Sequence, residues 1–166
     1  MSAPAALVRL VEPWSHLYSD SKVIPTIVQF THIAALVVAG GFAIALDRAT
    51  LRAARGSHDE RRRHLVDLGA AHRVVIGGLS VSAVSGLLLF TADIENFFTS
   101  GIFWTKATMI ALLLANGYWM TRTEARMRAD PDAIDASWPR LNRAARTSFF
   151  LWFAIAFAGV ALVNLS

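Results

Sequence analysis

The stretch Ile24–Leu46, IPTIVQFTHIAALVVAGGFAIAL, decides the fold of this chain. It contains no Asp, Glu, Lys or Arg, and Asp47-Arg48 follows it directly. An α-helix rises about 1.5 Å per residue, so about 20 apolar residues cross the ~30 Å of hydrocarbon in a bilayer. The stretch therefore predicts a membrane-spanning helix, with Pro25 in its first turn, where a proline is well tolerated.

Three further stretches have a similar length and apolar character. A soluble helical bundle would carry a charged stripe along each helix, and these stretches have none. We therefore predict an all-α fold, a bundle of four transmembrane helices that forms a single membrane domain over residues 1–166. The predicted spans are about 24–46, 68–92, 102–121 and 149–165, and the two long loops are 47–67 and 122–148.

The composition agrees with this fold and excludes several classes of function. Hydrophobic residues make up 55% of the chain, and its mean hydropathy is +0.46. The absence of cysteine excludes disulfides, thiolate zinc sites, cysteine-held iron–sulfur clusters and cysteine nucleophiles. A glycine-rich phosphate loop, an HExxH motif and a serine nucleophile elbow are also missing. We expect that the protein is not an enzyme on its own.

The arginines are concentrated in the two long predicted loops. They are Arg48, Arg52, Arg55, Arg61, Arg62 and Arg63 in the first loop, and Arg122, Arg126, Arg128, Arg140, Arg143 and Arg146 in the second. Loops of this kind stay in the cytoplasm. We therefore predict a multi-pass protein of the bacterial inner membrane with both termini on the periplasmic side. We assign the net charge of +4 to contact with membrane lipids and not to nucleic acid.

Residues 1–23 are too short and too interrupted in hydropathy to span a membrane. They lack the basic region, apolar core and cleavage site of a secretory signal, so we expect the first span to be retained. Trp14 and Tyr18 are suited to the depth of the lipid headgroups. The prediction is an interfacial segment on the outer side.

Small residues recur at four-residue spacing in several spans. They are Ala35, Ala39 and Ala43 in the first span, Gly78, Ser82 and Gly86 in the second, and Ala154 and Ala158 in the last. Such stripes let helix backbones approach closely in lipid. They predict tight helix packing, either within a monomeric bundle or across a homodimer.

Two histidines fall inside predicted spans, where an imidazole is costly unless it is paired or ligated. His32 lies about 12 Å below the outer edge, and His72 lies about 6–10 Å from the cytoplasmic edge. Antiparallel helices then separate the two by about 10–15 Å in height, which disfavours one shared haem. Separate b-type haems, each with another second ligand, fit these heights, and Met109 offers a sulfur ligand near the level of His32.

Each of these histidines also has a structural interpretation. His32 is expected to bond a helix carbonyl or Gln29 if it is not a ligand. His72 is expected to be reached by water or to pair with Asp67. These alternatives stay open at the level of sequence.

Two other polar residues lie in the third predicted span. Lys106 is close enough to the outer edge to extend to the surface or to pair with Asp93 or Glu95. Asn116 is placed to bridge helices through its side-chain amide. No row of acids or bases crosses the predicted bilayer, so the sequence lacks the usual marker of a proton relay or an ion path.

The chain resembles a family of small bacterial membrane proteins with four helices. The likeness rests on Thr31-His32-Ile33, Gly40-Gly41, Leu46-Asp47-Arg48, Ala71-His72-Arg73, Ser85-Gly86-Leu87-Leu88-Leu89-Phe90, Phe103-Trp104-Thr105-Lys106 and Asn116-Gly117. More distantly, it is similar to CopD-like copper-resistance membrane proteins and to b-type cytochrome four-helix bundles. The distant likeness implies electron transfer or metal handling, although the chain lacks the paired histidines at matching depth of two-haem bundles.

These observations lead to three functional hypotheses. The first is a redox-associated subunit that binds haem b through His32, with His72 and Met109 as further candidate ligands, and exchanges electrons with quinol or a partner at the outer face. The second is a non-catalytic scaffold or accessory subunit of a membrane complex. The third is the handling of copper or another metal by His32 and Met109.

Overall fold

The computed structural model describes residues 3–165, except for the side chains of Ala70, Val163 and Leu165, and all regular structure in this part is helical. The elements are α1 (Ala5–Asp20), α2 (Val23–Ala53), α3 (His58–Ala92), α4 (Ile94–Thr99), α5 (Gly101–Ala129) and α6 (Ala133–Leu165). The prediction of an all-α chain is confirmed.

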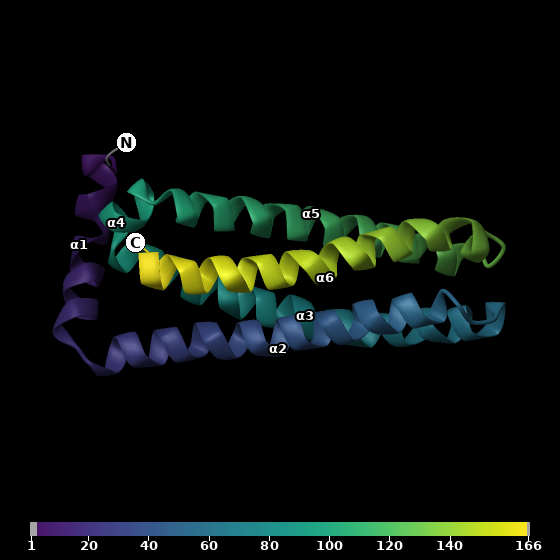
Figure 1. Ribbon diagram of the computed structural model, residues 1–166. Coiled ribbons are helices and arrows are strands. Elements are labelled where there is room, and N and C mark those ends of the chain that lie inside the picture. Colours follow the sequence, from purple (N-terminus) through teal and green to yellow (C-terminus); the bar gives the residue numbers. More distant parts are fainter. Residues whose placement is uncertain (1–2, 166) are drawn as a thin grey trace.

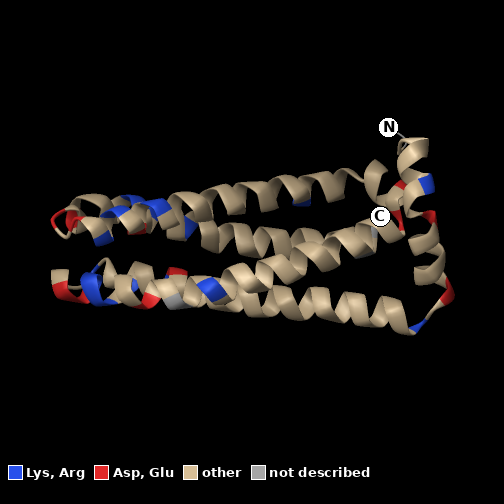
Figure 2. Ribbon diagram, turned by 180° about the vertical axis from the view of Figure 1, so that it is seen from behind, with Lys and Arg blue, Asp and Glu red and all other residues tan. Residues whose placement is uncertain are grey.

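The long helices α2, α3, α5 and α6 run side by side along one axis (Figure 1). Helices α1 and α4 and both chain ends lie at one end of the molecule, which we call the termini end. The opposite end, formed by the α2–α3 and α5–α6 connections, carries most of the Lys and Arg residues and is called the arginine-rich end (Figure 2). The predicted segregation of cations to one end is thus reproduced in three dimensions.

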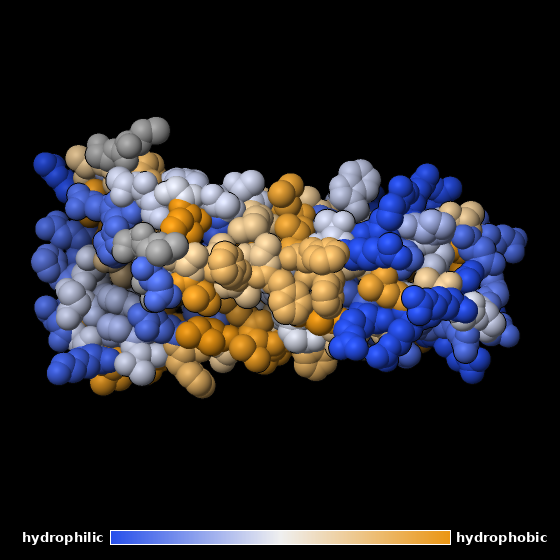
Figure 3. Space-filling view, viewed as in Figure 1, coloured by the Kyte–Doolittle hydropathy of each residue, from blue (hydrophilic) through white to orange (hydrophobic). Residues whose placement is uncertain are grey.

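Three of the long helices, α2, α3 and α6, are long and apolar enough to cross a membrane. A band of hydrophobic surface lies between two hydrophilic ends (Figure 3). This arrangement is that of a membrane protein. Helix α5 is not among the three. Lys106 interrupts its apolar run, and its last turns are charged.

Helix continues through most of the two ranges predicted as long loops between spans, 47–67 and 122–148. Hydropathy marks where the apolar surface ends, whereas Arg, Glu and Ala in these ranges are good helix formers. The actual helix ends follow local chemistry. Ser57 and Glu60 form a capping box at the start of α3, and Gly56 leaves space for the Glu60 carboxylate.

The connection between α5 and α6 forms at Asp130-Pro131-Asp132, a sequence whose residue types favour a turn. Asp130 Oδ1 accepts a hydrogen bond of 3.1 Å from the Asp132 backbone N–H. An aspartate that binds the backbone two residues later is a common turn former. Pro139, by contrast, lies inside α6.

The predicted interfacial segment is the helix α1, which lies across the termini end (Figure 1). Trp14 Nε1 donates to the Leu88 carbonyl at 2.9 Å, and Ser15 Oγ donates to the Ala92 carbonyl at 2.8 Å. Ala92 is the last residue of α3, where a helix leaves its carbonyl groups without intrahelical partners, and Leu88 lies one turn earlier. Helix α1 therefore covers the end of α3.

Small residues bring α2 and α3 into close contact, as predicted. A Cβ atom on Gly78 would lie 2.9 Å from the Ala39 Cβ and 3.2 Å from the Ala35 carbonyl oxygen. Ala39 is completely buried, and Ser82 is buried on the same face of α3 as Gly78. The α2–α3 pair is therefore fixed by backbone proximity, which places His32 directly against α3.

Two apolar clusters form the interior. The first, toward the arginine-rich end, contains Leu65, Leu68, Met120, Met127, Ile134, Trp138, Leu141 and Ala145. The second, nearer the middle, contains Ala39, Ala43, Val75, Leu113, Trp152 and Ile155. Polar side chains are buried beside these clusters, and they form the candidate sites.

Candidate functional site

His32 is held against α3 by its Nδ1 atom. Nδ1 lies 3.0 Å from the Ser82 carbonyl oxygen and 3.1 Å from Ser85 Oγ. A carbonyl oxygen only accepts, so Nδ1 donates this hydrogen bond and Nε2 carries the lone pair of the neutral ring. Gly86 makes room for the ring, because a Cβ there would lie 3.0 Å from His32 Cε1. The hydrogen bond to a helix carbonyl is the one that the structural interpretation of His32 predicts.

Lys106 turns into the bundle rather than toward the outer acids. Its Nζ would lie 3.5 Å from a Cβ on Gly159 of α6, and its charge acts on His32. In the part of the chain that the structure describes, Lys106 forms no ion pair with Asp93 or Glu95. The predicted outer ion pair is therefore wrong. Because Gly159 of α6 has no side chain, it leaves space for the Lys106 ammonium group inside the bundle.

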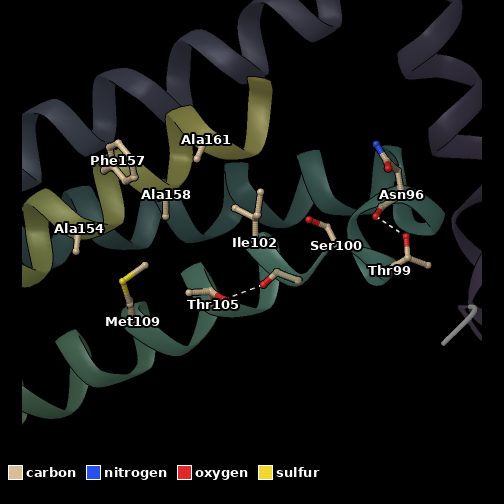
Figure 4. Close-up of a pocket in the computed structure, with 11 residues that line it drawn as sticks. Asn96, Thr99, Ser100, Ile102, Thr105, Met109, Ala154, Phe157, Ala158 and Ala161 are labelled. Carbon is tan, nitrogen blue, oxygen red and sulfur yellow. Dashed lines mark hydrogen bonds between the residues drawn. The ribbon is translucent and has the colours of Figure 1, made fainter. Parts of the chain in front are cut away.

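Met109 lines a groove between α5 and α6 at the termini end. The groove has a volume of about 690 Å³. Its residues are Asn96, Thr99, Ser100, Gly101, Ile102, Thr105, Met109, Ala154, Phe157, Ala158 and Ala161. Figure 4 shows Met109 and Ile102 on one wall facing Ala154 and Ala158 on the other, with Asn96, Thr99 and Ser100 at the outer end. The groove thus has polar groups at one end and an apolar interior.

A second polar group lies between the long helices toward the arginine-rich end. We call Asp47, His72, Glu124, Arg128 and Ser148 the Asp47–Glu124 cluster. His72 Nδ1 lies 3.4 Å from Glu124 Oε2, and Arg128 Nη2 lies 3.3 Å from the same oxygen. The Ser148 hydroxyl interacts with the Asp47 carboxyl. The cluster therefore takes members from α2, α3, α5 and α6.

Both carboxyl groups of this cluster are deeply buried. Asp47 is 2% exposed and Glu124 is 0% exposed. One oxygen of each, Asp47 Oδ2 and Glu124 Oε1, has no hydrogen-bond partner in the described structure. Buried carboxyl groups are rare unless paired, and they are associated with function in membrane proteins.

The partner of His72 differs from the prediction. The sequence pairs His72 with Asp67 or with water, whereas the structure pairs it with Glu124. Asp67 is exposed, because it faces away from the bundle on α3. The side chain of His72 is 20% exposed, and its Nδ1 lies beside the buried acid.

Further polar contacts extend the cluster toward the arginine-rich end. Thr50 Oγ1 and His64 Nε2 lie 2.8 Å apart, and Thr50 is completely buried. Arg128 also donates to the Leu65 carbonyl through Nη2 at 2.9 Å. Asn116 Nδ2 donates to the Ala144 carbonyl at 2.9 Å, which confirms the predicted bridge between α5 and α6.

Comparisons with known proteins do not assign a function to this chain. No protein-family model, curated protein or solved structure matches the chain. Among the described residues, no three His, Asp or Glu side chains are grouped so that they could hold a metal ion.

The three predicted ligands occupy three separate settings. His32 bonds α3, His72 pairs with Glu124, and Met109 lines the α5–α6 groove, which includes neither histidine. A haem on His32 would have to bind Nε2, because Nδ1 is engaged by Ser82. The residues do not assemble a haem pocket from these ligands in this arrangement, and iron ligation stays a prediction.

Sequence reasoning missed Asp47 and Glu124 as interior residues, because it interpreted them as stops at the ends of spans. A signal for Asp47 was present. It extends the four-residue series Ala35, Ala39 and Ala43, which faces α3. Ala43 and Asp47 are about one helical turn apart, and a residue that continues a buried helical stripe stays on the buried face.

Proposed function

We propose that α2, α3, α5 and α6 each cross the bacterial inner membrane, with both termini on the periplasmic side and the arginine-rich end in the cytoplasm. The apolar length of α2, α3 and α6 and the concentration of arginine at one end support this orientation. Helix α5 packs along α6 and reaches α3 through the Glu124–His72 pair, so a bilayer that surrounds the other three helices also surrounds α5 (Figure 1).

We propose further that the protein is a redox-associated membrane subunit that binds a quinol at the α5–α6 groove. The groove carries this proposal. Its volume of about 690 Å³ is within the range of about 300–1,000 Å³ that is usual for small-molecule sites. A quinol is an amphiphile with a polar ring and an apolar tail. The groove likewise has polar residues at its outer end and apolar residues in its interior.

The walls of the groove offer suitable contacts to each part. The amide of Asn96 and the hydroxyls of Thr99 and Ser100 lie at the outer end, where ring oxygens need hydrogen bonds (Figure 4). Met109 and Phe157 supply polarizable and aromatic contacts in the interior. Electrons from the quinol would pass to a partner subunit, so the proposed role includes membership of a membrane complex.

Photolabelling with a quinone analogue that carries an azide tests this proposal. We expect labelled peptides from α5 and α6 that include the groove residues, and we expect excess unlabelled quinone to suppress the labelling. Ala154→Phe fills the groove and should abolish labelling. Ala156→Phe, on the exposed face of the same helix, is the matched control and should leave it intact. Equal labelling of both variants contradicts a quinol site in the groove.

Haem b on His32 is the second candidate function. The observation that favours it is the hydrogen bond from Nδ1 to the Ser82 carbonyl, which leaves the lone pair of Nε2 available to bind iron. Histidines that bind metals are commonly oriented in this way. Ultraviolet–visible spectra of the purified protein, oxidised and reduced, test it. A preparation from haem-replete cells without Soret absorbance excludes it.

The two remaining hypotheses make different predictions. A scaffold or accessory subunit is colourless, gives no quinone labelling and recovers a partner in native pull-down. Copper handling through His32 and Met109 requires bound metal in protein purified without a histidine tag. Metal analysis of His32→Ala beside the wild type distinguishes that case.

A further inference from the structure

Asp47 differs from Glu124 in the charges that surround it. Glu124 has two cationic or potentially cationic neighbours, Arg128 at 3.3 Å and His72 at 3.4 Å. Asp47 forms no ion pair within the described residues, and Ser148 supplies only a neutral hydroxyl. A carboxylate that is 2% exposed and lacks a cationic partner is strongly disfavoured relative to the neutral acid.

The net charge of the cluster also favours the binding of one proton. With both carboxyl groups ionised, Asp47 and Glu124 carry two negative charges and Arg128 carries one positive charge. One additional proton makes the cluster neutral. Arg128 and Glu124 already form a pair, so the proton belongs on Asp47 or on His72, whose charge acts on Asp47.

We infer that the Asp47 carboxyl binds a proton at neutral pH and exchanges it through His72 with water at the arginine-rich end. The unpartnered Asp47 Oδ2, buried on α2 where it packs against α3 and α6, is the atom that carries the proton. On release, the O–H bond of Asp47 breaks and the proton passes to His72 and then to water. This inference does not depend on the quinol proposal, because the groove lies at the opposite end.

The geometry of His72 suits this exchange. Its Nδ1 lies 3.4 Å from the Glu124 carboxylate, and a neutral imidazole has one ring nitrogen that can accept a proton. The side chain is 20% exposed, whereas that of Glu124 is 1% exposed. His72 thus lies beside the buried Glu124, acts electrostatically on Asp47 and is more exposed than either acid.

Two helices that pack against α2, namely α3 and α6, contribute to the electrostatic surroundings of Asp47. Helix α3 supplies His72 and, further along, His64, and His72 in turn lies beside Glu124 of α5, which pairs with Arg128. Helix α6 supplies the hydroxyl of Ser148, which does not titrate. The positive charge of Arg128 is directed at Glu124, so Asp47 is left as the group that gains most from a proton.

Infrared difference spectroscopy of the intact protein tests the site directly. Spectra between neutral and alkaline pH should contain a carbonyl band of a protonated, buried carboxylic acid, shifted in D₂O. Exposed carboxyl groups are already ionised over this range, since their pKa values are about 4. Asp47→Asn should remove the band. Glu124→Gln and the exposed-residue control Asp132→Asn should retain it.

Isotope labelling keeps the test independent of variant folding. Carbon-13 in aspartate side chains should shift the band of the wild-type protein, and carbon-13 in glutamate side chains should leave it in place. His72→Gln should keep the band and slow its response to D₂O. The inference is overturned if the wild type has no such band, if the band shifts with labelled glutamate, or if it persists in Asp47→Asn.

Discussion

His72 Nδ1 on α3 lies 3.4 Å from Glu124 Oε2 on α5, and the Glu124 side chain is fully buried. This pair joins two helices that are distant in the sequence. It also places Glu124, which is predicted to lie in a loop next to a span, in the interior of the bundle. The energetic consequences of this placement can be measured.

Glu124→Ala should destabilise the protein by about 1–3 kcal/mol, because it leaves His72 and Arg128 without their buried acceptor. Thermal unfolding in detergent measures this change as a lowered Tm. Glu95→Ala is the control, since Glu95 is exposed and forms no ion pair in the described structure, and its effect should stay within about 0.5 kcal/mol. Equal melting temperatures for the two variants would rule out a structural role for the pair.

Gly78 and Gly77 form a matched pair on α3. Gly78→Ala should cost about 1–3 kcal/mol, because the new methyl group meets the Ala39 Cβ at 2.9 Å. Gly77→Ala has nothing within 4 Å and should be neutral or stabilising by up to about 1 kcal/mol through helix propensity. Melting temperatures of both variants measure the difference. The close α2–α3 contact is refuted if Gly78→Ala is as stable as Gly77→Ala.

The Asp135 carboxylate at the start of α6 predicts a pH-dependent contact with α3. Arg61 Nη1 donates to Asp135 Oδ1 at 2.6 Å, and His58 Nδ1 lies 3.2 Å from Oδ2. The hydrogen bond from Arg61, followed by that from His58, holds the pKa of Asp135 below its usual value. A lowered folded-state pKa stabilises the protein above the unfolded pKa, about 3.9, and the contribution is lost as the pH falls through the folded pKa.

We therefore expect Asp135→Asn to melt slightly below the wild type at neutral pH and to converge with it in acid. Unfolding curves over this pH range measure the convergence. Asp132→Asn lacks these partners and should remain parallel to the wild type throughout. A constant difference between Asp135→Asn and the wild type would show that the contribution does not arise from ionisation.

The proposed four crossings can be tested with single cysteines, because the chain has none of its own. Asp20→Cys and Glu95→Cys should react with an impermeant maleimide added from the periplasmic side. Asp59→Cys and Asp132→Cys should react only after the membrane is permeabilised. If positions 95 and 132 react from the same side, α5 does not cross, and the four-span proposal fails.

Several features could be predicted because they depend on local sequence. The apolar runs of α2, α3 and α6 identify helices long enough for a membrane, and Asp130-Pro131 identifies the turn between α5 and α6. The Asn116 bridge also follows from its place in an apolar stretch, since a buried amide requires a partner. Each prediction needs only composition, spacing or turn chemistry.

The orientation and partners of ionisable side chains could not be predicted in this way. Lys106 turns toward Gly159, and His72 selects Glu124 over Asp67. Both outcomes depend on which helix lies opposite. Glu124 is a further example. Its charge suggests a position at the membrane boundary, whereas its position on α5 buries it inside the bundle.

The sequence by itself determined an all-helical, strongly apolar chain with its arginines gathered in two segments, because these properties follow from residue type and spacing. Only the tertiary structure decided that Asp47 lies beside Ser148 of α6, that Glu124 lies beside His72 of α3, that His32 bonds the Ser82 carbonyl, and that the groove between α5 and α6 lies at the termini end. The reason is physical. Hydropathy fixes where a helix is buried, but the partner of a polar atom is fixed by the neighbour that packing brings within about 3 Å.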